Sequence, residues 1–292
     1  MKRTLALLLF VASASHAIGV GYSIRSDGDQ KLYRIDLTTG VTTPVGTAKS
    51  SGFEGIEGLA FAPGCQTLYG VDDVKDRLVT CNRSTGACET VGSLGVDITD
   101  TGLTFANDGN LYLSTDAPKD PIRFFRINPG TGSAALVGAP GIEITGLAAN
   151  QSAVYGLGGD GKDVLVQVNT ETGEATTIGP LGTVTLQDGG LDFDRDGTLY
   201  GINDLGPGSG KASQIFKIDL ATGRATVVAV TKDPSGKALN GFEGFAIDQG
   251  MCAVHGFGSA VALDAPALDG WGMTLMALGL IGAALFVLRR QA

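Results

Sequence analysis

The chain has 292 residues, 45 of them glycine, with a formal net charge of -9 and a pI near 4.7. This acidity argues against nucleic-acid binding, because phosphates would be repelled rather than neutralised. The glycines recur at turns between apolar segments and form no low-complexity tract, so the chain is predicted to be folded.

The first 17 residues, "MKRTLALLLFVASASHA", have the pattern of a secretory signal peptide. Lys2 and Arg3 form a basic start, an apolar core runs to Val11, and small residues precede a cut expected after Ala17. The apolar stretch is too short to span a bilayer. We therefore expect an exported mature chain that begins near Ile18, in a compartment where disulfides can form.

Two phrases then alternate down the chain, each recurring about every 45 residues. The first phrase predicts a strand, a turn and a strand, and its five copies begin at Gly58, Gly102, Gly146, Gly190 and Gly244. The second predicts a hairpin with a turn of the type Asp or Asn followed by Thr-Gly, and its copies begin at Leu32, Leu78, Phe124, Leu165 and Ile215. Each repeat is therefore expected to contribute four strands.

Four-stranded units at this period indicate an all-β fold, a β-propeller over residues 18–258, most simply with five blades. The chain starts inside a repeat, so residues 21–25 should form the second strand of a blade whose innermost strand is residues 244–248. This closure would remove an open sheet edge. Because "GYSIR" and "CAVHG" both fit that second-strand slot, six blades or an extra strand are an alternative.

Histidine offers little for catalysis, since the mature chain contains His255 alone, at a position where other repeats have the Tyr of "LYG". A packed strand residue is expected there rather than a catalytic base or a zinc ligand. No catalytic constellation is predicted.

A candidate calcium site is the segment "DFDRDG", with Asp192, Asp194 and Asp196 at alternate positions before a glycine. The closing acidic ligand of known calcium loops is missing, because Tyr200 and Asn203 stand where it would fall. The alternative is an ordinary hairpin turn.

A candidate ligand site is formed by Glu57 and Glu243, in the echoed phrases "GFEGIEGLAF" and "GFEGFAID". Both precede an innermost strand in neighbouring blades, where the other repeats have Thr101, Thr145 and Gly189. These residues are expected to line a polar, partly acidic mouth of the central channel. The alternative is a solvated strand start.

The four cysteines are expected to be structural. Cys81 and Cys88 face each other across the turn in "CNRSTGAC", which predicts a cross-strand disulfide. Cys65 and Cys252 lie in nearly equivalent turns of neighbouring blades, where a second bond would staple the closure. Four cysteines allow three pairings, so the pattern leaves the choice open.

At the end of the chain the sequence predicts a linker with a short motif over residues 259–270, followed by a transmembrane helix with a basic end over residues 271–292. Trp271 to Leu288 carry no charge, a length just sufficient to cross a bilayer. Arg289 and Arg290 favour a cytoplasmic C-terminus.

The phrase "APALDGWGM" with the span and basic end resembles the IPTL-CTERM class of C-terminal sorting signals of Gram-negative bacteria, which typically reads Ile-Pro-Thr-Leu-Ser-Glu-Trp-Gly. Pro266, Leu268, Trp271 and Gly272 match in register. Ala265, Ala267, Asp269 and Gly270 depart from it. The resemblance implies an exosortase-like membrane sorting protease as a partner, and delivery to the cell surface or matrix. The body resembles loosely defined propeller repeats of secreted bacterial proteins.

Together these features predict an exported, noncatalytic propeller that binds a protein, glycan or matrix component. It would be anchored in the inner membrane by its C-terminal helix, or processed and released to the surface. The alternatives are a calcium-dependent propeller enzyme, lactonase- or lyase-like, and a chiefly structural building block of the surface layer.

Overall fold

The computed structural model describes residues 19–26, 28–47, 52–53, 55–64, 67–117, 120–159, 161–206 and 209–248. All of them belong to the first of two compact units, Met1–Gly256, while the second is Phe257–Ala292. The predicted signal peptide, Cys65, Cys252, His255 and the whole C-terminal sorting and membrane segment lie outside the described residues. Within the described ranges no helix is long and apolar enough to span a membrane.

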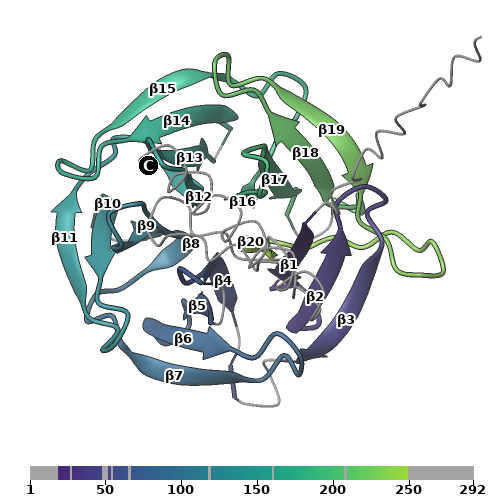
Figure 1. Ribbon diagram of the computed structural model, residues 1–292, viewed down its shortest axis with the longest axis horizontal. Helices are drawn as coiled ribbons and strands as arrows, with labels where there is room; N and C mark the ends of the chain where they lie inside the picture. The colour runs from purple at the N-terminus through teal and green to yellow at the C-terminus, as the bar shows by residue number, and fades with distance from the viewer. Residues whose placement is uncertain are drawn as a thin grey trace, which may run out of the picture. The chain divides into compact units, whose positions relative to one another are not determined.

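The described chain forms five antiparallel four-stranded sheets, arranged as blades around a common axis (Figure 1). This confirms the predicted all-β propeller and its five blades, each with its innermost strand nearest the axis. From the axis outward the blades are β20 (Phe245–Asp248), β1 (Val20–Ile24), β2 (Lys31–Asp36), β3 (Thr42–Thr47); β4 (Ile56–Phe61), β5 (Leu68–Asp72), β6 (Arg77–Cys81), β7 (Cys88–Ser93); β8 (Thr99–Phe105), β9 (Leu111–Ala117), β10 (Asp120–Ile127), β11 (Ala134–Gly138); β12 (Ile144–Ala149), β13 (Val154–Gly158), β14 (Val164–Val168), β15 (Ala175–Pro180); and β16 (Asp188–Phe193), β17 (Leu199–Asp204), β18 (Gln214–Ile218), β19 (Ala225–Val230).

The first of these blades joins the two ends of the domain. Strand β20 pairs antiparallel with β1, with Phe245 opposite Ser23 and Asp248 opposite Val20. The predicted closure is therefore confirmed, and the six-blade alternative is wrong for the described residues. "GYSIR" supplies the second strand of this blade, and "CAVHG" lies outside the described residues.

The outer hairpins owe their shape to the acid or amide that opens each turn. In the second blade, Asn82 Oδ1 accepts hydrogen bonds from the backbone N–H groups of Ser84 and Thr85 at 2.9 and 3.1 Å. Gly86 follows with a φ of 69°, a backbone conformation that favours glycine. The same side-chain capping recurs at Asp36, Asn128, Asn169 and Asp219.

The hydrophobic core is divided among the seams between neighbouring blades. Each of its five clusters draws buried side chains from two adjacent blades. At the closing seam, Tyr200 and Ile215 of the last blade pack with Ile35 and Phe245 of the composite blade. The ring is therefore held closed by the same kind of apolar contact that joins its consecutive blades.

The disulfide between Cys81 and Cys88 confirms one predicted pairing. The two residues are register partners on β6 and β7, with their Cα atoms 4.0 Å apart. The bond ties the outer hairpin of the second blade at its turn.

Candidate functional site

Every blade places an acidic residue shortly before the glycine of its innermost strand. Glu57, Asp100 and Asp188 lie within β4, β8 and β16. Glu143 immediately precedes β12, and Glu243 lies two residues before the start of β20. Because the blades surround one axis and these positions are nearly equivalent, the five residues fall at the same end of the innermost strands. We call these five residues the axial acidic ring.

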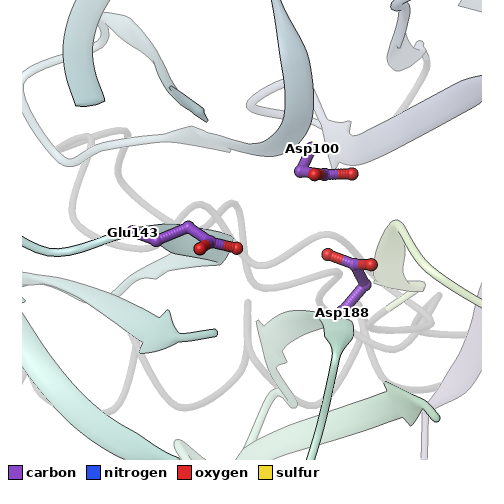
Figure 2. A group of neighbouring side chains, drawn as sticks. All are labelled: Asp100, Glu143 and Asp188. Atoms are coloured by element: carbon purple, nitrogen blue, oxygen red, sulfur yellow. The ribbon is translucent and has the colours of Figure 1, made fainter. Parts of the chain in front are cut away.

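Three members of the ring converge closely. One carboxylate oxygen from each of Asp100, Glu143 and Asp188 lies within 4.8 Å of the other two. Figure 2 shows the three carboxylates pointing toward a shared centre from three successive blades. All three side chains are half-buried. Among the described residues this is the group of acidic, histidine or cysteine side chains with the geometry to hold one metal ion.

The other two members belong to the same electrostatic unit. Burial raises the pKa of Glu57 well above its ordinary value, and the charges of Glu243, Asp73, Asp100 and Asp188 raise it further. Asp73, just after β5, has its pKa raised to about 6, first by burial and then by the charges of Asp72 and Asp100. These carboxyl groups therefore disfavour one another's ionised forms, which a cation at the mouth would stabilise.

Two hydrogen bonds position these glutamates. The backbone N–H of Thr101 donates to Glu57 Oε2 at 3.2 Å, which ties β4 to the next innermost strand. The hydroxyl of Ser26 donates to Glu243 Oε2, and the Glu243 side chain is buried. These hydrogen bonds therefore fix the positions of both glutamate side chains.

Below the ring the axis is closed by backbone. Gly58, Gly102, Gly146, Gly190 and Gly244, with the apolar residue that follows each, line a space of about 140 Å³ that is too narrow for a water molecule. A Cβ atom on Gly102 would lie 2.8 Å from the backbone of Gly146, and one on Gly244 would lie 2.8 Å from the backbone of Gly58. Glycine is required because the innermost strands approach this closely. A ligand at the ring therefore meets a mouth with a closed floor.

Two threonines line the same axial space. Thr101 and Thr145 are only 2% and 3% exposed, yet their hydroxyl oxygens have no hydrogen-bond partner in the described part of the chain. Buried hydroxyl groups are normally paired, so two orphaned ones, on the residue after Asp100 and two residues after Glu143, mark an incomplete polar site.

The "DFDRDG" acids take other roles. Asp192 uses both carboxylate oxygens on backbone, accepting from Ile247 N–H at 2.7 Å in the neighbouring blade and from Phe193 N–H at 2.8 Å. Asp194 Oδ1 accepts from the N–H groups of Asp196 and Thr198 at 3.0 and 2.8 Å, closing the turn between β16 and β17. The Asp196 side chain is exposed. These three residues do not form the converging group described above.

A second hollow lies away from the ring, between the third and fourth blades. It has a volume of about 690 Å³ and a lining of amide and hydroxyl side chains, among them Asn107, Asn150, Gln151, Gln167 and Asn169. Amide and hydroxyl groups predominate in this lining, which also includes the acidic residues Asp108 and Glu171.

Sequence reasoning placed Glu57 and Glu243 at the mouth but missed Asp100, Glu143 and Asp188. It compared only the position directly before each glycine, where those three blades have Thr101, Thr145 and Gly189. The signal was an acidic residue one to three positions before every glycine of the innermost strands. Oxygen ligands alone, as in this ring, are the set preferred by hard cations such as Ca²⁺ and Mg²⁺.

No family model and no curated protein matches this chain. Solved structures similar to it include a structural genomics protein of unknown function from Bacteroides thetaiotaomicron VPI-5482, at 16% identity and a TM-score of 0.47, covering 62% of this chain. The chain spans about half of that protein, 52%. A chain of the nidogen/laminin complex is similar at 15% identity and a TM-score of 0.49, covering 80% of this chain and 85% of that one. At such identity the likeness concerns the fold alone.

Proposed function

We propose that this protein is an exported, noncatalytic β-propeller that binds a protein, glycan or matrix component of the cell surface at the mouth formed by the axial acidic ring. The observation that carries the proposal is the convergence of the Asp100, Glu143 and Asp188 carboxylates from three successive blades. The acids of the other two blades, Glu57 and Glu243, interact electrostatically at the same mouth. A closed floor below the ring suits a ligand that docks on the mouth, because the axial space lined by the described residues has no room for a water molecule.

The charge of the mouth selects the ligand's chemistry. A cluster of carboxylates partly withdrawn from water favours a cationic group, or a ligand that reaches the carboxylates through a bound cation. A neutral glycan that ignores this charge would instead fit the amide-lined hollow near Gln167. Variants at the two places therefore separate the two modes of binding.

Quantitative binding of the full-length protein to cell envelopes and matrix preparations tests the proposal. Glu57→Gln combined with Glu243→Gln is expected to weaken binding at least tenfold, because it removes two carboxyl groups that could pair with a cationic ligand while keeping side-chain size. Glu89→Gln combined with Glu174→Gln, at exposed positions that line neither the mouth nor the second hollow, is the matched control and should bind as wild type. Equal binding by both double variants, with loss in Gln167→Ala, would move the site to the other hollow.

The cellular part of the proposal is that the C-terminal segment anchors the protein in the inner membrane or is removed by an exosortase-like sorting protease. Its support is the register of Pro266, Leu268, Trp271 and Gly272 followed by an uncharged stretch and two arginines. Mass spectrometry of native protein from membrane and medium is expected to find released chains that lack the segment ending "LRRQA". Recovery of the full-length chain from membranes alone would support anchoring by the C-terminal segment and would contradict its removal by a protease.

A calcium-dependent propeller enzyme of the lactonase or lyase type is the second candidate, and the carboxylate convergence at the axis also favours it. In that case a lactone panel would be turned over with added CaCl₂, and Glu57→Gln would lower kcat. A protein that binds envelopes but turns over none of the panel fits the first proposal.

A further inference from the structure

We propose that the axial mouth binds one divalent cation of the oxygen-preferring class, best matched by Ca²⁺, through the carboxylates of Asp100, Glu143 and Asp188. The hydroxyls of Thr101 and Thr145 complete the site from the axial side. This inference goes beyond the proposed function and does not depend on it, because it concerns an ion and not the surface ligand.

The spacing of the carboxylates is the first argument. Ca²⁺ binds oxygen at 2.3–2.6 Å, so two ligands on opposite sides of the ion are separated by about 5 Å at most. The three carboxylate oxygens lie within 4.8 Å of one another, so all of them fit one coordination shell. Like charges held this close repel one another, and a cation between them would offset this repulsion.

The origin of the carboxylates is the second argument. They come from β8, the residue before β12, and β16, three blades that are linked at the axis only through their innermost strands. The close glycine contacts between these strands, such as Gly102 with Gly146 and Gly146 with Gly190, fix their spacing. The ring therefore presents the carboxylates in a set geometry before any ion arrives.

The threonine hydroxyls are independent evidence for a ligand. Each is almost fully buried, lines the axial space, and lacks a hydrogen-bond partner within the described residues. A hydroxyl oxygen keeps lone pairs that can coordinate a hard cation directly. Carboxylates and orphaned hydroxyls thus lie at the same end of the same axis.

Isothermal titration of chelator-treated full-length protein with CaCl₂ tests the site, in the absence of any surface ligand. Wild type is expected to bind one ion and to show a rise in Tm with CaCl₂. Asp188→Asn is expected to weaken binding at least tenfold without lowering Tm in EDTA, because it removes one of the mutually repelling charges. Glu171→Gln, an exposed acid of the same charge, should titrate as wild type.

Thr145→Val provides a second variant with an unusual pair of outcomes. It keeps the side-chain shape and removes the orphaned hydroxyl, so Tm in EDTA should rise by a few degrees while Ca²⁺ affinity falls several-fold. If Thr145 had only a structural role, its replacement by Val would leave the Ca²⁺ affinity unchanged. The proposal is overturned if wild type shows neither heat nor a Tm shift up to about 10 mM CaCl₂. It is also overturned if Asp196→Asn, in the exposed turn, abolishes binding while Asp188→Asn does not.

Because this titration contains no envelope material, its failure leaves the proposed surface binding testable on its own. Conversely, Ca²⁺ could bind at Asp100, Glu143 and Asp188 while the Glu57→Gln and Glu243→Gln double variant still binds envelopes as wild type does. That result would contradict the proposed function and support the ion site.

Discussion

At the scale of single residues, the most informative contrast is between Asp188 and Asp192, four positions apart on β16. Asp188 joins the converging carboxylates at the mouth. Asp192 instead satisfies backbone N–H groups of its own strand and of β20. Its pKa is raised to about 7, chiefly because burial disfavours the charged form. Two aspartates of one strand thus have different roles, because Asp188 lies at the start of β16 and Asp192 lies near its end.

The raised pKa of Asp192 predicts a pH dependence of stability. Since the folded pKa lies above the unfolded one, the folded protein holds a proton between about pH 4 and pH 7 that the unfolded chain releases. This contribution to the unfolding free energy is present below pH 4 and is lost as pH rises to 7. This contribution is absent in Asp192→Asn, so the unfolding free energy of the variant should rise relative to that of wild type by about 3 kcal/mol between pH 4 and pH 7.

Urea unfolding at several pH values between 4.5 and 7.5 measures this difference. Asp196→Asn, which removes one exposed charge from the adjacent turn, is the control and should run parallel to wild type. Parallel curves for Asp192→Asn as well would mean that the Asp192 carboxylate is ionised in the folded protein at all these pH values.

At the scale of elements, the outer hairpins lock neighbouring blades together through glycine contacts. Gly132, in the turn between β10 and β11, has a φ of 81°, and a Cβ atom there would lie 2.5 Å from the carbonyl oxygen of Gly92 on β7. Equivalent contacts join Gly86 with Gly46 and Gly223 with Gly179. The recurring Thr-Gly of the sequence therefore serves both the turn and the seam between blades.

Gly132→Ala is expected to lower the unfolding free energy by at least about 3 kcal/mol, because it combines backbone strain with a clash against a neighbouring backbone. Gly141→Ala isolates the first effect, since Gly141 has a φ of 76° and open space around its missing Cβ. That control should lose only about 1 kcal/mol. Equal losses in the denaturation midpoints of the two variants would show that the seam tolerates a methyl group.

At the scale of the whole molecule, closure is the decisive event, since the last strand of the ring pairs with the first. Strand β20 pairs with β1, and apolar packing around Phe245 joins the composite blade to the last blade. An ion pair of Arg83 with Asp248 at 2.5 Å also ties β20 to the second blade. Thr42 N–H also donates to the carbonyl oxygen of Lys232 at 2.8 Å, which links the outer edges of the first and last blades.

Phe245→Ala is expected to cost about 3–5 kcal/mol, because this side chain is almost fully buried at the seam. The loss should be cooperative along the ring, so hydrogen exchange of amides in β1 and β16 should accelerate together with those of β20. Leu147→Ala, at the equivalent place of an internal interface, is the comparison. Acceleration confined to β20 would show that the closing strand opens without the rest of the blade.

Much of the fold could be predicted from the sequence, because it rests on local chemistry that repeats. The Asp or Asn with Thr-Gly turns, the alternating apolar strands and the split first repeat together predicted five four-stranded blades and their closure. The pairing of Cys81 with Cys88 followed from one hairpin. These features depend on neighbours within a few tens of residues, so linear spacing was enough.

The candidate site depended on the tertiary structure. Asp100, Glu143 and Asp188 are more than 40 residues apart and stand at unequal distances before their glycines, so no linear motif joins them. Only the ring, drawn tight by glycine contacts at the axis, brings them within 4.8 Å. The local triplet of Asp192, Asp194 and Asp196 was the more visible pattern, but backbone N–H groups occupy Asp192 and Asp194. Sequence therefore determined which elements form and how they close, while closure itself decided which charges meet.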